Sequence, residues 1–423
     1  MKKYDSYKDS GIDWIGRIPV DWVCVRLKTI VKEPLKYGAN ESAEDDNPNN
    51  PRYIRITDFG SNGNLKDDTF KSLPIEIAQK YLLEDGDLLF ARSGATVGKT
   101  FLFKNYDGIA CYAGYLIKAT FDKSKINSTY IDYVTRSNYY ENWKLSIFQQ
   151  ATIQNIGADK FNLFKIPIPK NIEEQTAIAN YLDQKTSQID DLIAKKERLI
   201  QLLEEERTAI INQAVTKGLD PTVPMKDSGI EWLGEIPAHW EVKRMRYLCD
   251  ITTGGKDTEN REDDGQYPFY VRSQTVERIS TYSFDGEAIL TAGDGVGVCK
   301  VWHYVNEKFD FHQRVYMMCN FKSVIGKYLF YYLKENFGKE VMKLSAKSTV
   351  DSLRRPMFQN FMVCFGSLEE QKQIISHIEK EELRIETLIT KYHQEIELLK
   401  EYKTALISEV VTGKVDVREE KLS

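Results

Sequence analysis

The sequence predicts a mixed α/β protein in which two similar domains are separated by two long helices. The helices are expected to pair as an antiparallel coiled coil, which would relate the domains by an approximate two-fold axis. Three observations predict this fold class. The chain contains an internal repeat, each copy of the repeat ends in a long charged stretch without glycine or proline, and the segments between these stretches alternate between strand-like and helix-like patterns.

The repeat is clearest at the start of each copy. Residues 8–28, KDSGIDWIGRIPVDWVCVRLK, recur as residues 226–246, KDSGIEWLGEIPAHWEVKRMR, with eleven of 21 positions identical at a shift of 218. Composition alone does not produce matches this dense. The identical positions include one proline and two tryptophans per copy: Trp14, Pro19 and Trp22, then Trp232, Pro237 and Trp240. We interpret these tryptophans as structural anchors.

Further along the chain the repeat continues with a drifting shift. The segment from Gly86 aligns with the segment from Gly286 at a shift of 200, and Thr152 aligns with Thr349 at a shift of 197. The motif EEQ follows in both copies at a shift of 196. The second copy is therefore 22 residues shorter than the first. The ends of the repeated unit are alike and the middle differs.

Each copy closes with a heptad-patterned stretch, residues 172–217 and 368–412. Two helices of about 40 residues, each about 60 Å long, are expected. Lys196 interrupts the first seam, where we expect its ammonium to extend toward water. The predicted seam consists of Leu182, Ile189, Leu203, Ile210, Ile378, Ile385, Tyr392, Leu399 and Leu406.

Stop signals and composition divide the chain further. GLDPTVP, from Gly218 to Pro224, ends the first helix and forms a linker. Between the helices, segments such as RYIRITDF (52–59) and GDLLFA (86–91) resemble strands, and residues 128–147 and 326–345 resemble helices. The predicted divisions are a first domain at 1–170, a helix at 171–217, a linker at 218–224, a second domain at 225–366, a helix at 367–414 and a tail at 415–423.

Charge and composition narrow the function classes. The net charge of −5 is uneven: basic minus acidic residues give +3 for 1–170, −4 for 171–224, 0 for 225–366 and −4 for 367–423. The acidity lies in the helical stretches, so it does not exclude DNA as a ligand of the domains. Six scattered cysteines and five histidines without metal-binding spacing predict neither disulfides nor a metal site. Without a signal peptide or an apolar run of membrane-spanning length, a cytoplasmic location and no membrane association are expected.

RSGATVGKT, residues 92–100, resembles a phosphate-binding P-loop only superficially. The motif needs a glycine where Ser93 stands, and it needs a helix after the loop. The following TFLF reads instead as a second strand. We therefore predict a hairpin with a glycine-rich turn.

The paired KDSGI[DE]W[IL]G[RE]IP..W segments, the EEQ helix starts, the [AV]VT[KG][GK] helix ends and the variable middles resemble the specificity subunit of type I restriction-modification systems. The likeness spans essentially the whole chain. It implies two target-recognition domains, each reading one half of a bipartite site in double-stranded DNA. It also implies helices that set the spacer length and dock two methyltransferase subunits and the restriction (translocase) subunits. S-adenosylmethionine, ATP and Mg²⁺ are then expected only in those partners, and this chain is expected to be non-catalytic.

Three polar segments in each domain are candidates for contacting DNA, through phosphates or base edges. In the hairpin, Gly94 and Gly98 would permit close approach, and Gly98 aligns with Gly297. The alternative for each segment is structural: a tight turn, a core strand with a surface salt bridge, or a polar loop before a helix. The hairpin candidates are Arg92, Ser93, Gly94, Thr96 and Lys99, with loose counterparts in Asp294 and Lys300. The strand candidates are Arg55 and Thr57, aligned with Arg272, Ser273 and Gln274. The loop candidates are Gln150, Thr152, Gln154 and Asn155, aligned with Lys347, Ser348, Thr349 and Arg354.

Two other functions are open to this sequence. A two-headed coiled-coil scaffold that binds proteins and no DNA would share the same architecture. An NTPase or a methyltransferase in its own right is disfavoured, because the P-loop fails. NPNNP at 47–51 is also a poor match to the [DN]-P-P-[YF] loop of adenine methyltransferases.

Overall fold

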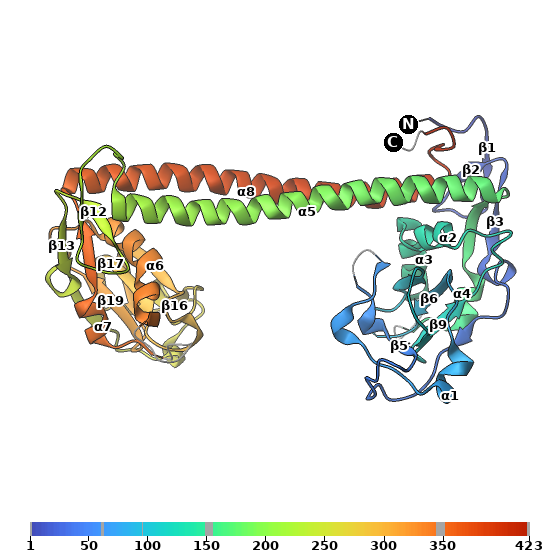
Figure 1. Ribbon diagram of the computed structural model, residues 1–423, viewed down its shortest axis with the longest axis horizontal. Helices are drawn as coiled ribbons and strands as arrows, with labels where there is room; N and C mark the ends of the chain where they lie inside the picture. Colours follow the sequence, from blue (N-terminus) through green and yellow to red (C-terminus); the bar gives the residue numbers. More distant parts are fainter. Residues whose placement is uncertain (1, 61–62, 95, 149–154, 344–351, 421–423) are drawn as a thin grey trace. The chain divides into compact units, whose positions relative to one another are not determined.

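The computed structural model describes residues 2–60, 63–94, 96–148, 155–343 and 352–420. The chain forms two compact units. The first unit comprises residues 1–196 and 394–423, and the second comprises residues 197–393. Each unit therefore contains one globular segment together with part of each long helix (Figure 1).

The prediction of two long helices is confirmed. They are α5 (Ile172–Lys217) and α8 (Leu368–Val411). The shorter helices are α1 (Ile75–Ala78), α2 (Ser128–Thr135), α3 (Asn138–Phe148), α4 (Ala158–Leu163), α6 (Gly326–Lys343) and α7 (Arg355–Asn360).

In the first unit, a four-stranded sheet has the order β4-β9-β6-β7, and β6 pairs antiparallel with both of its neighbours. Strands β5 and β8 pair in parallel, whereas β1–β2 and β3–β10 form antiparallel pairs. The strands are β1 (Tyr7–Asp9), β2 (Arg17–Pro19), β3 (Trp22–Arg26), β4 (Lys36–Tyr37), β5 (Arg52–Ile54), β6 (Asp87–Ala91), β7 (Thr100–Phe103), β8 (Ala110–Tyr112), β9 (Leu116–Ala119) and β10 (Lys165–Pro169).

In the second unit, a six-stranded sheet has the order β14-β19-β17-β18-β15-β16, in which β15 and β18 are parallel. The pairs β11–β12 and β13–β20 repeat the β1–β2 and β3–β10 pairs of the first unit. The strands are β11 (Met225–Asp227), β12 (Glu235–Pro237), β13 (Glu241–Arg244), β14 (Asp250–Thr253), β15 (Tyr267–Tyr270), β16 (Glu277–Ile279), β17 (Phe284–Ala292), β18 (Trp302–Phe311), β19 (Val315–Cys319) and β20 (Met362–Phe365).

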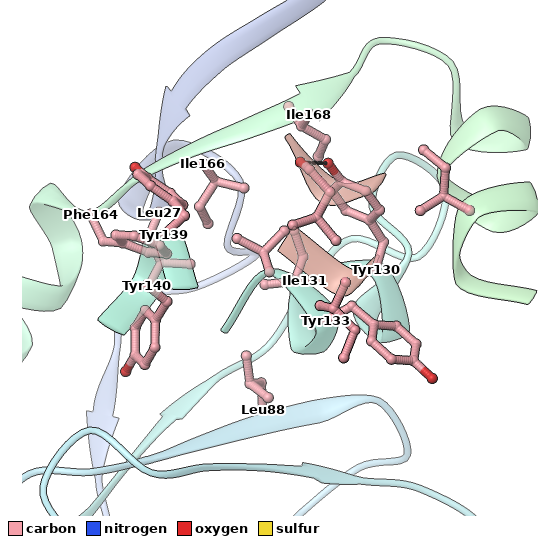
Figure 2. Packing of buried hydrophobic residues seen from close by; sticks show 14 of the residues in the cluster. Leu27, Leu88, Tyr130, Ile131, Tyr133, Tyr139, Tyr140, Phe164, Ile166 and Ile168 are labelled. Carbon is pink, nitrogen blue, oxygen red and sulfur yellow. Dashed lines mark hydrogen bonds between the residues drawn. The ribbon is translucent and has the colours of Figure 1, made fainter. Parts of the chain in front are cut away.

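The main core of the first unit lies between α2–α3 and the sheet. Figure 2 shows Leu88 of β6 on the sheet below Ile131 and Tyr133 of α2. On the other side of α2, the Tyr133 hydroxyl donates to Asp183 of α5 at 2.6 Å. Helix α2 is thus packed between the sheet and the long helix, and its apolar side chains Tyr130, Ile131, Tyr133 and Val134 are buried.

Residues 128–147 do not form the single helix that the sequence predicts. The chain breaks between α2 and α3 at Arg136 and Ser137, where the buried Ser137 hydroxyl donates to the Val134 carbonyl at 2.6 Å. A serine hydroxyl that bonds to the preceding turn competes with helix continuation. In the second unit the corresponding helix α6 is continuous.

The long helices contact each other within each unit. In the first unit, the Lys403 ammonium lies 2.7 Å from both carboxylate oxygens of Asp190, and Lys196 pairs with Glu395. In the second unit, Arg207 pairs with Glu386 at 2.9 Å. Lys196 therefore has an acidic partner on α8, which the sequence does not predict. Of the predicted seam residues, five are buried (Leu182, Ile189, Ile378, Ile385 and Leu406) and four are half-buried (Leu203, Ile210, Tyr392 and Leu399).

The tryptophans Trp22 and Trp240 are fully buried and anchor each domain to the start of a long helix. The indole N–H of Trp22 donates to Glu174 at 3.0 Å, and that of Trp240 donates to Glu370 at 3.2 Å. Both acceptors are the second glutamate of an EEQ motif. The motif and the IP..W segment therefore recur together because they bind each other.

The end of the chain packs onto the first unit in the way that the end of α5 packs onto the second. Lys414 donates to the carbonyl oxygens of Ile15 and Arg17, and Lys217 donates to those of Leu233 and Glu235. The residues that follow α8 are also tied to the N-terminus, since the Asp416 N–H donates to the Lys2 carbonyl at 2.9 Å.

Candidate nucleic-acid interface

The turn from Arg92 to Lys99 joins two antiparallel strands, as predicted. The Ala91 N–H donates to the Lys99 carbonyl at 2.8 Å, and the Gly98 N–H donates to the Ala91 carbonyl at 2.7 Å. Strand β7 begins directly afterwards, at Thr100. A P-loop would need a helix N-terminus at this point to hold a phosphate, so the turn is not of that kind.

This turn lies beside the third candidate segment in both units. In the first unit, Ser93 forms an antiparallel bridge with Asn155, and the Ile156 N–H donates to the Arg92 carbonyl at 2.8 Å. In the second unit, Asp294 forms the same bridge with Ser352, and the Leu353 N–H donates to the Gly293 carbonyl at 2.7 Å. The candidates Gln150, Thr152, Gln154, Lys347, Ser348 and Thr349 lie outside the described residues.

The bridges correct the alignment of the two turns. Ala91 is the last residue of β6 that pairs with β9, and Ala292 is the last residue of β17 that pairs with β19. These two residues are therefore equivalent, which gives a shift of 201 rather than 200. Asp294 therefore corresponds to Ser93, not to Arg92, and Lys300 corresponds to Lys99. Gly98 corresponds to Cys299, and both have positive φ, so the predicted match of Gly98 with Gly297 is wrong.

The two glycines of the first turn have different roles. Gly94 is exposed, and a Cβ there would meet nothing within 4 Å. Gly98 is buried, its φ is +79°, and a Cβ there would lie 2.2 Å from Lys144. Gly98 therefore serves packing, and only Gly94 keeps an open approach to the backbone. Thr96 and Lys99 are exposed beside it.

Arg92 is held against an aromatic ring. Its guanidinium carbon lies 5.0 Å from the ring centre of Tyr37, whose hydroxyl accepts from the Ala158 N–H at 3.0 Å. Such stacking fixes the plane of a guanidinium group. The buried Arg92 Nε has no hydrogen-bond partner among the residues described.

Arg55 faces inward. It contacts both carboxylate oxygens of Asp58 at 2.9 and 3.2 Å and donates to the Thr69 carbonyl at 2.6 Å. Strand β5 ends at Ile54 and a short 3-10 helix follows, so RYIRITDF is not one continuous strand. These contacts are the kind expected from the structural alternative for this segment, and the Arg55 side chain is 27% exposed. Thr57 is exposed.

The alignment of Arg55 with Arg272 is also wrong. The Ile54 carbonyl accepts from the Ala113 N–H, and the Tyr270 carbonyl accepts from the His312 N–H in the same way. Ile54 is therefore equivalent to Tyr270, and the next residue, Arg55, is equivalent to Val271. A shift of one residue along an extended segment moves a side chain to the opposite face. That difference accounts for an inward Arg55 and an exposed Arg272.

In the second unit, Asp294 lies between two arginines. Its carboxylate accepts from Arg272 at 2.9 Å and from Arg314 at 2.5 Å. Burial alone would raise the pKa of Asp294, but the two guanidinium groups outweigh burial and lower it. Asp294 therefore remains charged. The other candidates in this unit, Ser273, Gln274, Lys300 and Arg354, are exposed.

The structure also places beside the two turns three residues that are not among the predicted candidates: Tyr37, Tyr115 and Arg314. Tyr115 and Arg314 occupy equivalent positions, because the Arg92 N–H donates to the Tyr115 carbonyl and the Gly293 N–H donates to the Arg314 carbonyl. The GYLIKATF and RVYMMCNF segments would not have revealed this pair, because aligning them at the shift of 200 places Tyr115 opposite Val315. Tyr37 carries no such sequence signal either.

Two further findings apply to the described part of the chain. It contains no group of three or more His, Cys, Asp or Glu side chains placed to hold a metal ion. None of its helices has the length and apolar character needed to cross a membrane.

Comparison with known proteins identifies the family. The type I restriction modification DNA specificity domain matches residues 19–202 and again residues 237–398. Over 95% of both chains, the sequence is 25% identical to the type I restriction enzyme MjaVIII specificity subunit of Methanocaldococcus jannaschii. It is 26% identical to the type I restriction enzyme EcoDI specificity subunit of Escherichia coli over 43% of this chain and 40% of that protein.

Two solved structures share the fold. A chain from a study of complex assembly and conformational transition of the type I R-M system matches with a TM-score of 0.73 and 15% identity, covering 94% of this chain and 99% of that one. The HsdS subunit of Thermoanaerobacter tengcongensis matches with a TM-score of 0.58 and 16% identity, covering 94% and 98%. Because the specificity domain matches both halves of the chain and most of its length, the protein belongs to the family of type I restriction-modification specificity subunits.

Proposed function

We propose that each unit reads one half of a bipartite sequence in double-stranded DNA. The observation that carries this proposal is the common backbone frame of the two turns. The Ser93–Asn155 and Asp294–Ser352 bridges place the same two segments side by side in each unit, while the side chains on them differ. A shared frame with different exposed polar side chains is what two readers of different half-sites require.

The long helices would set the distance between the two half-sites. In the proposed arrangement α5 and α8 pair as an antiparallel coiled coil and relate the two domains by a pseudo-two-fold axis. The Asp190–Lys403 and Arg207–Glu386 ion pairs support helix pairing, as do the buried seam residues. The acidic outer faces of the helices would dock two methyltransferase subunits and the restriction subunits.

We further propose that this subunit is non-catalytic and acts in the cytoplasm. S-adenosylmethionine, ATP and Mg²⁺ would be bound by the partner subunits. The sequence supports this division, because its only P-loop-like segment is a hairpin turn. A read-out function needs no bound cofactor, since the affinity and specificity come from side chains facing the phosphates and base edges.

Methylome sequencing tests the proposal. The chain is co-expressed with its partner methyltransferase subunit in a host that lacks both. The expected result is methylation in a split motif with a fixed gap, whereas neither chain alone methylates. Continuous or simply palindromic methylated sites would contradict the two-reader arrangement. If duplex libraries yield no enriched bipartite sequence with or without the methyltransferase, the protein-binding scaffold is favoured.

A further inference from the structure

The second unit carries an exposed arginine–aspartate–arginine cluster. The side chain of Asp294 is 15% exposed, whereas those of Arg272 and Arg314 are 45% and 62% exposed. Asp294 accepts one N–H from each arginine. Each guanidinium group has five N–H donors, so most of them do not contact this carboxylate.

The cluster stands on the frame that both units share. Asp294 occupies the position of Ser93, and Arg314 occupies the position of Tyr115. In the first unit neither position bears a charge. The two units therefore differ in charge at these positions, although equivalent bridges and hydrogen bonds hold the backbone there.

Stability accounts for only part of this arrangement, because both arginines are exposed although Asp294 is largely buried. Ion pairs between exposed side chains contribute little to folding, because water screens them and ordering a long side chain costs entropy. A carboxylate that holds two exposed guanidinium groups does have one clear effect. It fixes their positions before any ligand arrives, so less conformational freedom is lost on binding.

The chemistry of the cluster suits guanine. In the major groove guanine presents two adjacent acceptors, O6 and N7, and the fork of an arginine donates to both. Lys300 and Arg354 are exposed in the segments that flank Asp294 and Ser352, and their charge favours a phosphate backbone nearby.

We propose that Arg272 and Arg314 read guanine in the half-site bound by the second unit and that Asp294 is a positioning residue for both. This inference rests on the proposed function. It assigns a base type to one reader, and it leaves the first unit, with Ser93 and Tyr115 at the matching positions, to read its half-site by different contacts.

The test uses the complex of this chain with its methyltransferase subunit. Its binding is measured to duplexes that carry the methylated motif, in which each guanine in turn is replaced by 7-deazaguanine. That replacement removes the N7 acceptor and keeps Watson–Crick pairing. For the wild type we expect affinity to fall by about 5- to 150-fold at one or two guanines of one half-site.

The variants identify the residues responsible. The measured quantity is the ratio of the affinity for the duplex with guanine to the affinity for the duplex with 7-deazaguanine at the same position. Arg272→Ala and Arg314→Ala should each bring this ratio close to one at one guanine. Arg272→Lys and Arg314→Lys should do the same while retaining more of the overall affinity, because lysine keeps the charge and lacks the fork. Asp294→Asn, and Asp294→Ser, which installs the residue of the first unit, should lower the ratio without shifting the melting temperature. Arg244→Ala, an exposed arginine on β13, is the control that should leave the ratio unchanged.

The outcomes separate the two levels of the proposal. A bipartite motif without guanine in either half, or a ratio that none of the variants changes, overturns the inference and leaves the proposed function standing. A shift in melting temperature on Asp294→Asn with an unchanged ratio means that Asp294 is only structural, which also overturns it. Failure to obtain a bipartite motif overturns the proposed function and this inference together.

Discussion

Gln175 and Gln371 make the same three hydrogen bonds in the two units. The side-chain oxygen of Gln175 accepts from the Asn127 N–H at 2.9 Å, and its nitrogen donates to the carbonyls of Lys125 and Pro169 at 3.1 and 3.0 Å. Gln371 does the same with Ile325, Ser323 and Gly366. Each glutamine therefore fastens the start of a long helix to the segment before α2 or α6 and to the end of strand β10 or the residue after strand β20.

Gln371→Glu should destabilise the protein by about 1–3 kcal/mol, because a carboxylate leaves two partly buried carbonyl groups without a donor and brings charge against them. The measurement is the free energy of unfolding in urea at pH 7. Gln373→Glu is the matched control, since Gln373 lies on the exposed face of α8. Equal effects of the two substitutions would show that the hydrogen bonds of Gln371 contribute little to stability.

Glu370 should make the stability of the protein depend on pH in the acid range. Burial disfavours its charged form, but hydrogen bonds from His239, Ser367 and Trp240 outweigh burial and lower its pKa to about 2. An unfolded glutamate has a pKa of about 4.3. The stabilisation is therefore complete above that pH and is lost as the pH falls toward 2.

Glu370→Gln should accordingly lower the urea midpoint at pH 7, and its deficit relative to the wild type should narrow at pH 3.5. Glu369→Gln is the control, because the Glu369 side chain is 71% exposed. A Glu370→Gln deficit of the same size at both pH values would contradict the assigned pKa shift.

The sequence predicts the structure correctly where local pattern or the repeat determines it. The long helices follow from their heptad pattern and from the absence of glycine and proline, and the hairpin follows from two apolar runs around a glycine-rich turn. The IP..W and EEQ motifs are recognisable because Trp22 and Glu174 contact each other, and so do their counterparts Trp240 and Glu370.

The sequence gives a wrong or no prediction where strand register, or a contact outside the helix and strand patterns, decides the orientation of a side chain. Arg55 and Arg272 align well by sequence, but the ladder places them one residue apart, and Asp58 captures Arg55. Tyr37 lies against Arg92 although 55 residues separate them, and nothing in the local pattern links the two. In the variable middle of the repeat, sequence pattern therefore predicts side-chain positions poorly, because tertiary contacts determine them.

Truncating Ile385 should show how much the helix seam contributes. Its side chain is fully buried, so Ile385→Ala is expected to cost about 2–5 kcal/mol. Leu383→Ala on the same helix is the matched control, because Leu383 is 71% exposed, and it should change the free energy of unfolding by less than about 0.5 kcal/mol. Similar losses from both variants would contradict the predicted seam.

Arg92 should contribute to DNA binding by the first unit, and its type of contact can be determined. If it contacts a phosphate, Arg92→Ala weakens binding of the complex with its methyltransferase subunit to all duplexes alike, and the slope of log affinity against log salt falls by about 0.9. If it reads a base, the loss is about 1–3 kcal/mol on the methylated motif and smaller on duplexes altered in one half-site. Tyr37→Leu should produce a weaker form of the same effect, because Arg92 keeps its charge but loses the ring that orients it. Arg26→Ala, at the repeat position of Arg244, is the control. If Arg92→Ala binds DNA as well as Arg26→Ala does, Arg92 is not part of the interface.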